Sequence, residues 1–346
     1  MNVNQVRVQK PAWRQAVSPY QHSNLRRSII QLANSFIPYV LLWAAMIWSL
    51  QVSYWLTLLL VVPASGFLVR LFIIFHDCGH GSFFASRKAN DTVGILTGLL
   101  VFTPYYRWRH DHAIHHATSG DLDRRGVGDV WMMTVQEYLD ASPRQQLVYR
   151  IYRNPLVMFV IAPLFAFIIG QRFAPKGTNK KGRRNVMWTN LAVLGIAAGM
   201  SALIGWKAYL MIQLPVMALA ASAGIWLFYV QHQYEGVYWA DHEHWDYFAA
   251  AIQGSSFYKL PRLLQWFSGN IGFHHIHHLS PRIPNYNLEK CHAENPLFHE
   301  VETITFWASF KSLSFRLWDT ERQQLVGFRF LREKQPDLVP VSSLPE

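Results

Sequence analysis

The chain has 346 residues, of which 51% are hydrophobic, 15% are aromatic and only 15% are charged. An average soluble domain has about 25% charged residues, and this apolar composition excludes a disordered chain, a fibrous repeat and a coiled coil. Two cysteines are too few for a disulfide framework, and a net charge of +11 favours a nucleic acid or an anionic membrane surface as partner. The long apolar stretches favour the membrane. Because no nucleic-acid-binding module is recognisable, we expect no nucleic-acid partner.

Four apolar runs are long enough to cross a bilayer as helices, which takes about 20 residues. They cover residues 29–50, 54–75, 186–205 and 208–230. The link within each consecutive pair is only two or three residues long, so each pair should form a hairpin whose two ends lie on one side of the membrane. The sequence therefore predicts an all-α integral membrane protein with four transmembrane helices in two hairpins.

Basic residues near the spans predict the orientation, because cytoplasmic loops carry an excess of Lys and Arg. Arg26 and Arg27 precede the first span and five basic residues in 176–184 precede the third, whereas the two hairpin tips carry one Lys. The protein should therefore lie in the cell membrane with its N-terminus, middle segment and long C-terminal region facing the cytoplasm and its two hairpin tips facing out. The expected parts are a cytoplasmic N-terminal tail (1–28), a membrane domain with the first two histidine segments (29–230), and a cytoplasmic helical cap (231–346).

Two shorter apolar runs cover residues 94–106 and 156–170. Both fall short of a full span and contain or adjoin proline, which favours interfacial or buried helices. If every histidine segment is to reach one site, an even number of crossings must separate them. This parity predicts that neither short run crosses the membrane.

The 16 histidines are gathered into a few short segments. HDCGH at 76–80 places two imidazoles at i and i+4 on one helix face, while HDHAIHH at 110–116 and HHIHH at 274–278 each contain an i, i+3, i+4 set. We call these boxes one, two and three. A further histidine follows the fourth span, so all four segments should share one membrane face. The candidate metal ligands are His76, His80, His112, His115, His116, His232, His274, His277 and His278.

This number of imidazoles predicts more than one metal ion. Imidazole binds zinc, copper, iron and nickel, and zinc uses four protein ligands in structural sites and three in catalytic ones. Nine histidines therefore point to two metals. An all-imidazole site at a membrane surface suits iron and oxygen chemistry better than zinc hydrolysis, although spacing alone leaves the metal open.

The three boxes resemble those of the membrane fatty acid desaturase family. Box three continues as HHLSPRIPNYNL, which is similar to the acyl-lipid branch of the family. The likeness covers nearly the whole chain, including RGVGDVWMMTVQEY, GSSFYKLPRLLQW and the late FRLWD. Within the branch, the sequence is most similar to the cold-inducible delta-5 enzymes of Gram-positive bacilli.

The resemblance implies a di-iron centre held by the nine histidines in a cytoplasmic helical cap over the membrane helices. It implies an enzyme that uses O2 to introduce a cis double bond into acyl chains of membrane phospholipids. Its electrons would come from a separate ferredoxin- or flavodoxin-like donor. In the stearoyl-CoA branch an Asn one turn before the fourth-segment histidine holds a metal-bound water; here that position is Phe228, and Asn270 is a candidate substitute.

Several neighbouring residues and rival functions remain open at this stage. Asp77 and Glu235 either orient imidazoles or are merely solvated, and His110 and His275 have supporting roles. The other histidines, 22, 242, 244, 292 and 299, are expected at the surface. The rival functions are a hydroxylase or ketolase of the same histidine-box superfamily, and a non-catalytic zinc-binding membrane protein.

Overall fold

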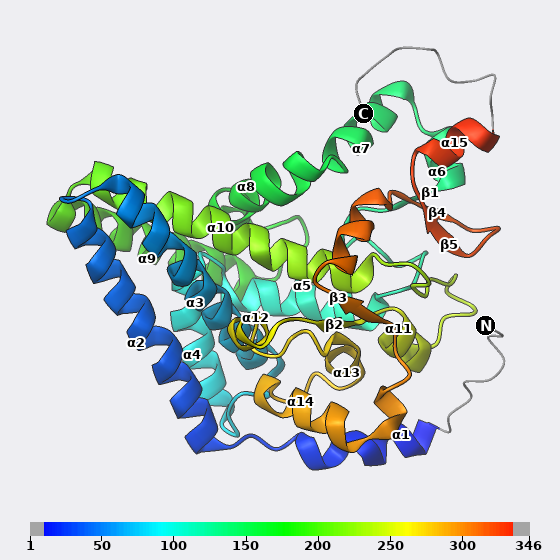
Figure 1. Cartoon of the computed structure of the whole chain (residues 1–346), viewed down its shortest axis with the longest axis horizontal. Helices are drawn as coiled ribbons and strands as arrows, with labels where there is room; N and C mark the ends of the chain where they lie inside the picture. Colours follow the sequence, from blue (N-terminus) through cyan, green and yellow to red (C-terminus); the bar gives the residue numbers. More distant parts are fainter. Residues whose placement is uncertain (1–9, 335–346) are drawn as a thin grey trace.

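The computed structural model describes residues 10–334, and it is predominantly helical, in agreement with the predicted fold class (Figure 1). The first nine residues of the expected tail and the last twelve of the expected cap, 335–346, lie outside this range. Strands in the described part are short and belong to two small sheets, β1-β4-β5 and β2-β3. The strands are β1 (Met133–Thr134), β2 (Phe257–Lys259), β3 (Thr303–Thr305), β4 (Leu317–Asp319) and β5 (Gln324–Val326).

Four helices are long and apolar enough to cross a membrane, which confirms the four predicted spans. All four extend beyond the predicted limits at one or both ends, and two of them carry histidines in their last turns. Box one therefore lies within the second long helix, and His232 is the last residue of the fourth. The four are α2 (Leu25–Ser49), α3 (Tyr54–His80), α9 (Lys180–Ile204) and α10 (Trp206–His232).

Helix α3 is the central helix of this bundle. In its most apolar stretch 56% of the residues are buried, against 6% for α9, which leaves α9 facing outward. Helix α3 packs against α2, α10 and α4 (Arg87–Leu100). The tight α2–α3 link is fixed by the hydroxyls of Ser49 and Thr57, which lie 2.8 Å apart.

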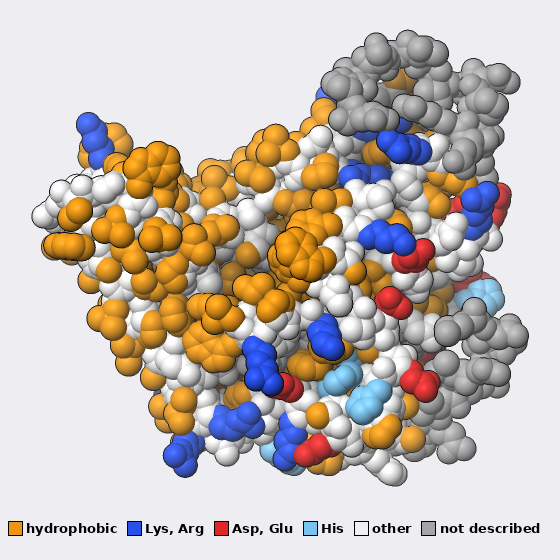
Figure 2. Space-filling model, in the orientation of Figure 1, with side chains coloured by type: hydrophobic (Ala, Val, Ile, Leu, Met, Phe, Trp, Pro, Cys, Tyr) orange, Lys and Arg blue, Asp and Glu red, His pale blue; other side chains and the backbone are white. Residues whose placement is uncertain are grey.

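Apolar side chains cover the outside of the helical hairpins, whereas charged side chains gather toward the other end of the molecule (Figure 2). Trp55 is 81% exposed and Leu203 is 80% exposed. In water such surfaces would cost about 25 cal/mol for each Å² of apolar area, a cost that a bilayer removes. The two ends of the molecule are thus suited to different solvents.

The short apolar runs form shorter helices. Residues 94–106 fall in α4 and the start of α5 (Tyr105–Thr118), and α4 with 14 residues is too short to span a bilayer. Residues 156–170 form π-helical η3 (Val157–Ile161), α8 (Ala162–Ile168) and the start of η4 (Gly170–Arg172). Together with α7 (Pro143–Tyr152) this segment makes a helix pair bent by 60°. Its exclusion from the membrane core stays a prediction.

The remaining elements surround the histidine-bearing ends of α3, α5 and α10. Helix α14 is tied to the start of α2, because Arg27 donates to Asn287 (2.8 Å) and Gln31 donates to Asn285 (2.9 Å). These elements are α1 (Lys10–Val17), η2 (Ser18–Tyr20), α6 (Val135–Asp140), α11 (Tyr247–Gln253), α12 (Arg262–Phe267), α13 (His274–Leu279), α14 (Asn285–Glu294), η5 (Pro296–Phe298), η6 (Ala308–Ser314) and α15 (Arg329–Lys334).

The hairpin topology makes a labelling prediction. A cysteine introduced by Asn179→Cys should react with a membrane-impermeant maleimide from the cytoplasmic side only, and Trp206→Cys from the outer side only. Asn179 is exposed, Trp206 is 60% exposed, and the two native cysteines are buried, so background labelling should be low. Labelling of Asn179→Cys from outside would require another crossing and would contradict the predicted orientation.

Candidate metal centre

Box one is presented by the last turn of α3. His76 and His80 lie one turn apart, with ring centroids separated by 4.7 Å, and α3 ends at Gly81, whose φ of 71° favours glycine. Asp77 is 1% exposed, and its Oδ1 lies 3.1 Å from Nδ1 of His76. Its Oδ2 accepts hydrogen bonds from the backbone and side-chain amides of Asn285 at 2.7 and 2.8 Å. Asp77 therefore orients an imidazole and joins α3 to α14.

Box two lies on α5, which crosses close to the end of α3. His115 Nδ1 is 2.6 Å from Oδ1 of Asp129, a carboxylate whose side chain is only 8% exposed. The adjacent Gly128 has φ 76°, and a Cβ there would lie 3.0 Å from Cβ of His115. A glycine at this position therefore lets the loop approach α5 closely enough for Asp129 to reach the ring.

The remaining candidate ligands come from α10 and α13. Nδ1 of His232 lies 3.1 Å from the carbonyl oxygen of Gly254, which directs Nε2 of His232 toward Nε2 of His274 at 3.0 Å. Helix α13 has only six residues, and its C-terminal carbonyls accept hydrogen bonds from the hydroxyl of Tyr247. Ile276 on its opposite face is fully buried. The short helix is thus fixed from both sides.

The structure brings eight of the nine predicted ligands into two adjacent groups. In each group the candidate ligand nitrogens lie within 4.8 Å of one another. Two rings link the groups, since His116 and His278 are stacked with centroids 4.2 Å apart. His274 is outside both sets and reaches the second through its contact with His232. The groups are His76, His80, His112, His116 and His277, and then His115, His232 and His278.

The chemistry of these nitrogens fits metal ions. The buried Nε2 atoms of His80, His115 and His278 have no hydrogen-bond partner. Nε2 of His116 lies 3.1 Å from Nε2 of both His112 and His277, so lone pairs converge where only a cation would satisfy them all.

Burial keeps these imidazoles in the form that binds metal. Burial and the neighbouring histidines lower the pKa of His112, His116, His274, His277 and His278 well below the ordinary value. Neutral imidazole is the ligand form, so the histidine cluster could hold metal without first losing protons to solvent.

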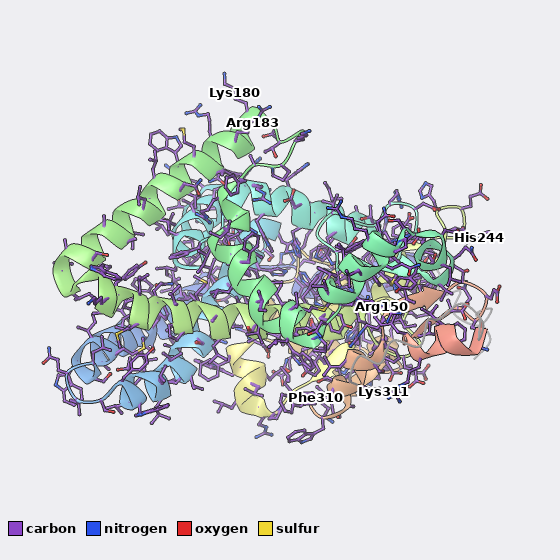
Figure 3. All side chains as sticks on the ribbon, turned by 90° about the horizontal axis from the view of Figure 1, so that it is seen from above. Arg150, Lys180, Arg183, His244, Phe310 and Lys311 are labelled. Atoms are coloured by element: carbon purple, nitrogen blue, oxygen red, sulfur yellow. The ribbon has the colours of Figure 1, made fainter. Side chains whose placement is uncertain are left out.

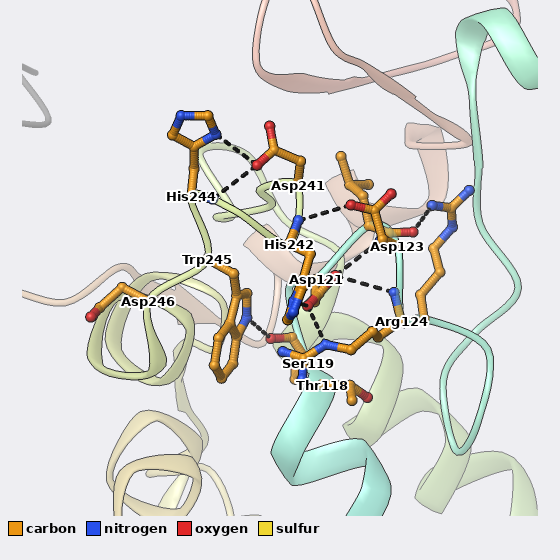
Figure 4. Close-up of polar contacts among 12 residues, drawn as sticks. Thr118, Ser119, Asp121, Asp123, Arg124, Asp241, His242, His244, Trp245 and Asp246 are labelled. Atoms are coloured by element: carbon orange, nitrogen blue, oxygen red, sulfur yellow. Dashed lines mark hydrogen bonds and ion pairs between the residues drawn. The ribbon is translucent and has the colours of Figure 1, made fainter.

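A polar network pins the end of α5 to the segment after α10 (Figure 4). Asp121 is fully buried and contacts the side chains of Arg124 (2.5 Å) and His242 (3.0 Å). Asp123 accepts a hydrogen bond from the backbone of His242, and Trp245 donates to the carbonyl of Ser119. Because His115 and His116 are in the last turn of α5, this network fixes the position of box two relative to His232.

The structure also shows the surroundings of Glu235, Asn270 and Phe228, which the sequence singled out near the candidate ligands. Glu235 is exposed and pairs with Lys311, so it is solvated and does not orient an imidazole. The amide of Asn270 donates to the carbonyl of Asn285, at 3.4 Å, and Phe228 packs against the rings of His115 and His232.

The histidines outside the candidate ligand set also differ from one another. His22, His242, His244 and His299 are exposed, as expected, but His292 is half-buried against Phe257 and Phe273 because it lies on the inner face of α14. His110 is exposed. His275 is fully buried and points away from the other box-three rings toward Phe257 and Phe298.

Asp129 was missed by sequence reasoning. Its only local signal is its position after two glycines in Gly126-Val127-Gly128, which predicts a turn but gives no partner. The contact with His115 depends on how the loop folds back onto α5.

An apolar cavity of about 500 Å³ leads to the histidines. His76, His112 and His274 are among the residues that line it. Its walls come from α3, the η3–α8 segment and α10, and they include Phe72, Met158, Ala166, Met217, Ala221 and Gly224. Such a space fits a flexible apolar chain.

Comparison with known proteins gives consistent matches over most of the chain. The sequence profile of the family described as "Fatty acid desaturase" matches residues 53–307. A "Fatty acid desaturase" of Bacillus subtilis is 50% identical over 330 residues, covering 95% of this chain and 92% of that protein. The "sn-1 acyl-lipid omega-3 desaturase (ferredoxin)" of Nostoc sp. is 29% identical over 67% of this chain and 66% of its own length. The "sn-1 oleoyl-lipid 12-desaturase" of Picosynechococcus sp. is 28% identical, with 80% and 81% covered.

The contact between His115 and Asp129 makes a prediction about metal affinity. Asp129→Asn should lower the affinity for added ferrous iron by about 10- to 100-fold, because the carboxylate no longer fixes the orientation and basicity of the ring. Iron titration of the purified protein measures this. Glu235→Gln is the matched control, since Glu235 is exposed, and it should bind iron like the unaltered protein. Equal affinity in both variants would show that Asp129 has no orienting role.

Proposed function

The chain belongs to the fatty acid desaturase family, and from this membership we propose that it introduces a cis double bond into acyl chains esterified in membrane phospholipids, using O2 and two iron ions. The observation that carries the proposal is the convergence of nine imidazoles beside an apolar cavity that three of them, His76, His112 and His274, line. The delta-5 position of the double bond is proposed from the sequence resemblance. The esterified form of the substrate is supported by the printed names of two relatives.

We propose that the two histidine groups hold one iron each. His76, His80, His112, His116 and His277 would surround one ion, and His115, His232, His274 and His278 the other. Bound iron would supply the power to activate O2 and to break an unactivated C–H bond, which no side-chain acid or base can do. Overall, the substrate gives up two hydrogens, and these combine with O2, two protons and two electrons from the donor to give an alkene and two waters.

The residues of this chain would bind and orient the substrate and exclude water. The cavity walls would make apolar contacts along the acyl chain. The reaction requires that one C–C bond of this chain be held close to the metals in a reactive orientation. Trp108 stacks on His112 with centroids 4.3 Å apart and lines the cavity next to it. Phe228 covers His115 and His232. These rings would keep the inner end of the cavity dry, which strengthens electrostatic interactions there.

The carboxylates would hold protons on the outer nitrogens of two rings. Asp77 and Asp129 face Nδ1 of His76 and His115, so each ring keeps its proton on Nδ1 and offers Nε2 to a metal. The carbonyl of Gly254 does the same for His232. This arrangement would preserve the ligand geometry through repeated turnover.

The proposal also covers the electron donor and the side of the membrane on which the site lies. The printed name of the Nostoc relative includes ferredoxin, which supports a ferredoxin- or flavodoxin-like donor here. The basic residues around the start of α9 support a cytoplasmic site.

The proposed reaction predicts a product and a metal content. Expression in a host without desaturases should produce cis-monounsaturated acyl groups in phospholipid, only when oxygen is present. The gently purified protein should contain about two iron per chain, because nine imidazoles exceed what one metal can use. Gas chromatography–mass spectrometry and metal analysis make the measurements, with His112→Ala as the inactive control. Hydroxylated chains would favour the hydroxylase alternative, and a protein containing zinc without iron would contradict the proposal.

We predict that narrowing the apolar cavity lowers the reaction rate on long acyl chains. Gly224 lines the cavity on α10, and a Cβ there would meet no atom within 4 Å. It lies eight residues before His232, or about 12 Å along the helix. Gly224→Phe should therefore block part of the space and lower the rate on long acyl chains by about tenfold or more.

The matched control is Gly199→Phe on the outward-facing α9, where a Cβ also meets nothing within 4 Å. Both changes replace a helical glycine, so the helix-propensity effect cancels. Acyl profiles from cells with equal membrane levels of each variant give the comparison. Equal losses in both variants would mean that the cavity does not hold the substrate.

A further inference from the structure

We propose that a basic surface pocket beside box two is the docking site of an acidic iron–sulphur protein of the ferredoxin type. The docked protein would deliver electrons to the proposed metal site by way of His80 and His112, which line the pocket. The inference rests on the proposed function, since it names the partner that supplies the reducing equivalents. It assigns a definite surface to that partner, separated from the apolar cavity by Trp108 and His112.

The pocket is an open cavity of about 440 Å³ formed where α4, α5 and α9 meet. Box residues His80 and His112 lie at its base, and both are only partly buried, unlike His116 and His277. The histidine groups can thus be approached from this pocket through the rings of His80 and His112. An electron entering at this point has no further protein layer to cross before it reaches the proposed ligands.

The charge of the pocket has one sign. Arg87, Arg109 and Lys181 line it, and no carboxylate is among the described residues that do so. Arg109 has a partner in Asp91, at 3.2 Å, outside the pocket. Within the described part of the chain, Arg87 and Lys181 have no ion pair, and the ammonium of Lys181 lies 3.7 Å from the centre of the Tyr106 ring.

The basic surface extends beyond the pocket along the start of α9. Figure 3 shows Lys180 and Arg183 projecting together from this helix end, far from Phe310 and Lys311 on the other side of the view. An extended basic surface fits a protein partner better than a single small anion, because complementary surface charge steers association and fixes orientation. Ferredoxin appears in the printed name of the Nostoc relative, and an acidic carrier matches the sign of this surface.

Two side chains separate this pocket from the apolar cavity. Trp108 and His112 line both spaces, with their rings stacked at an angle of 20°. Gly79 permits this arrangement, because a Cβ there would lie 3.0 Å from the Trp108 ring. The acyl chain and the electron donor would therefore bind on opposite sides of the Trp108–His112 pair, so both could be bound at the same time.

The test uses the full-length iron-loaded protein in lipid vesicles and a reduced acidic ferredoxin. Arg87→Glu and Lys181→Glu are compared with Lys259→Glu, an exposed lysine on β2 that does not line the pocket. Each pocket variant should lower kcat/KM for ferredoxin by about tenfold, mainly through KM, and the unaltered protein should lose affinity for ferredoxin as ionic strength rises. The Lys259→Glu control should match the unaltered protein.

A second measurement removes the donor. Each protein is reduced chemically without oxygen, freed of excess reductant and then given oxygen, and the alkene formed in one turnover is measured. A normal yield together with a raised KM for ferredoxin supports docking at this pocket. An unchanged KM for ferredoxin in both variants overturns the docking site while leaving the proposed function intact.

Three other outcomes are also decisive. A single-turnover yield that falls in parallel with the steady-state rate would mean that the pocket charges serve the metal centre itself, which overturns the docking proposal. A changed dependence on anionic lipid, with ferredoxin KM unaffected, would assign the pocket to lipid headgroups instead. Failure of the unaltered protein to form any alkene in the single turnover would reject the proposed function itself.

Discussion

The constraint on which the rest of the structure depends is the convergence of nine imidazoles from four separate segments of the chain. Their Nε2 atoms approach within about 3 Å of one another, as between His116 and His277, and several have no hydrogen-bond partner. Only cations placed among them would satisfy so many converging lone pairs. The chain must therefore bring four separate segments together. Asp77, Asp129 and the Gly254 carbonyl fix the orientation of three of the rings, His76, His115 and His232.

The helical hairpins provide the rigid part of this arrangement. Helices α3 and α10 carry their apolar stretches directly into histidine-bearing last turns, so the depth of His80 and His232 is fixed by the helices themselves. The short α13 has no such support and is held by the Tyr247 hydroxyl and a buried apolar face. Box two is held by the Asp121 network at the end of α5.

The same arrangement divides the surroundings of the two histidine groups into an apolar and a basic side. The apolar cavity runs between α3, α8 and α10, and the basic pocket opens between α4, α5 and α9. The stacked rings of Trp108 and His112 form the wall between them. The proposed reaction needs both a lipid chain and a soluble electron source. Two separate approaches would serve it, because the two partners require solvents of opposite character.

The sequence by itself determined the long helices and the candidate ligands, because apolar run length and i, i+3, i+4 spacing are local properties. It could not decide the roles of the neighbouring acids, since Asp77 and Glu235 look alike beside their histidines, yet one is buried against Asn285 and the other is exposed beside Lys311. It also missed Asp129, whose contact with His115 depends on a loop folding back onto α5. The cavity and the basic pocket were decided only by tertiary packing, because each is lined by residues distant in sequence whose neighbours no local pattern records.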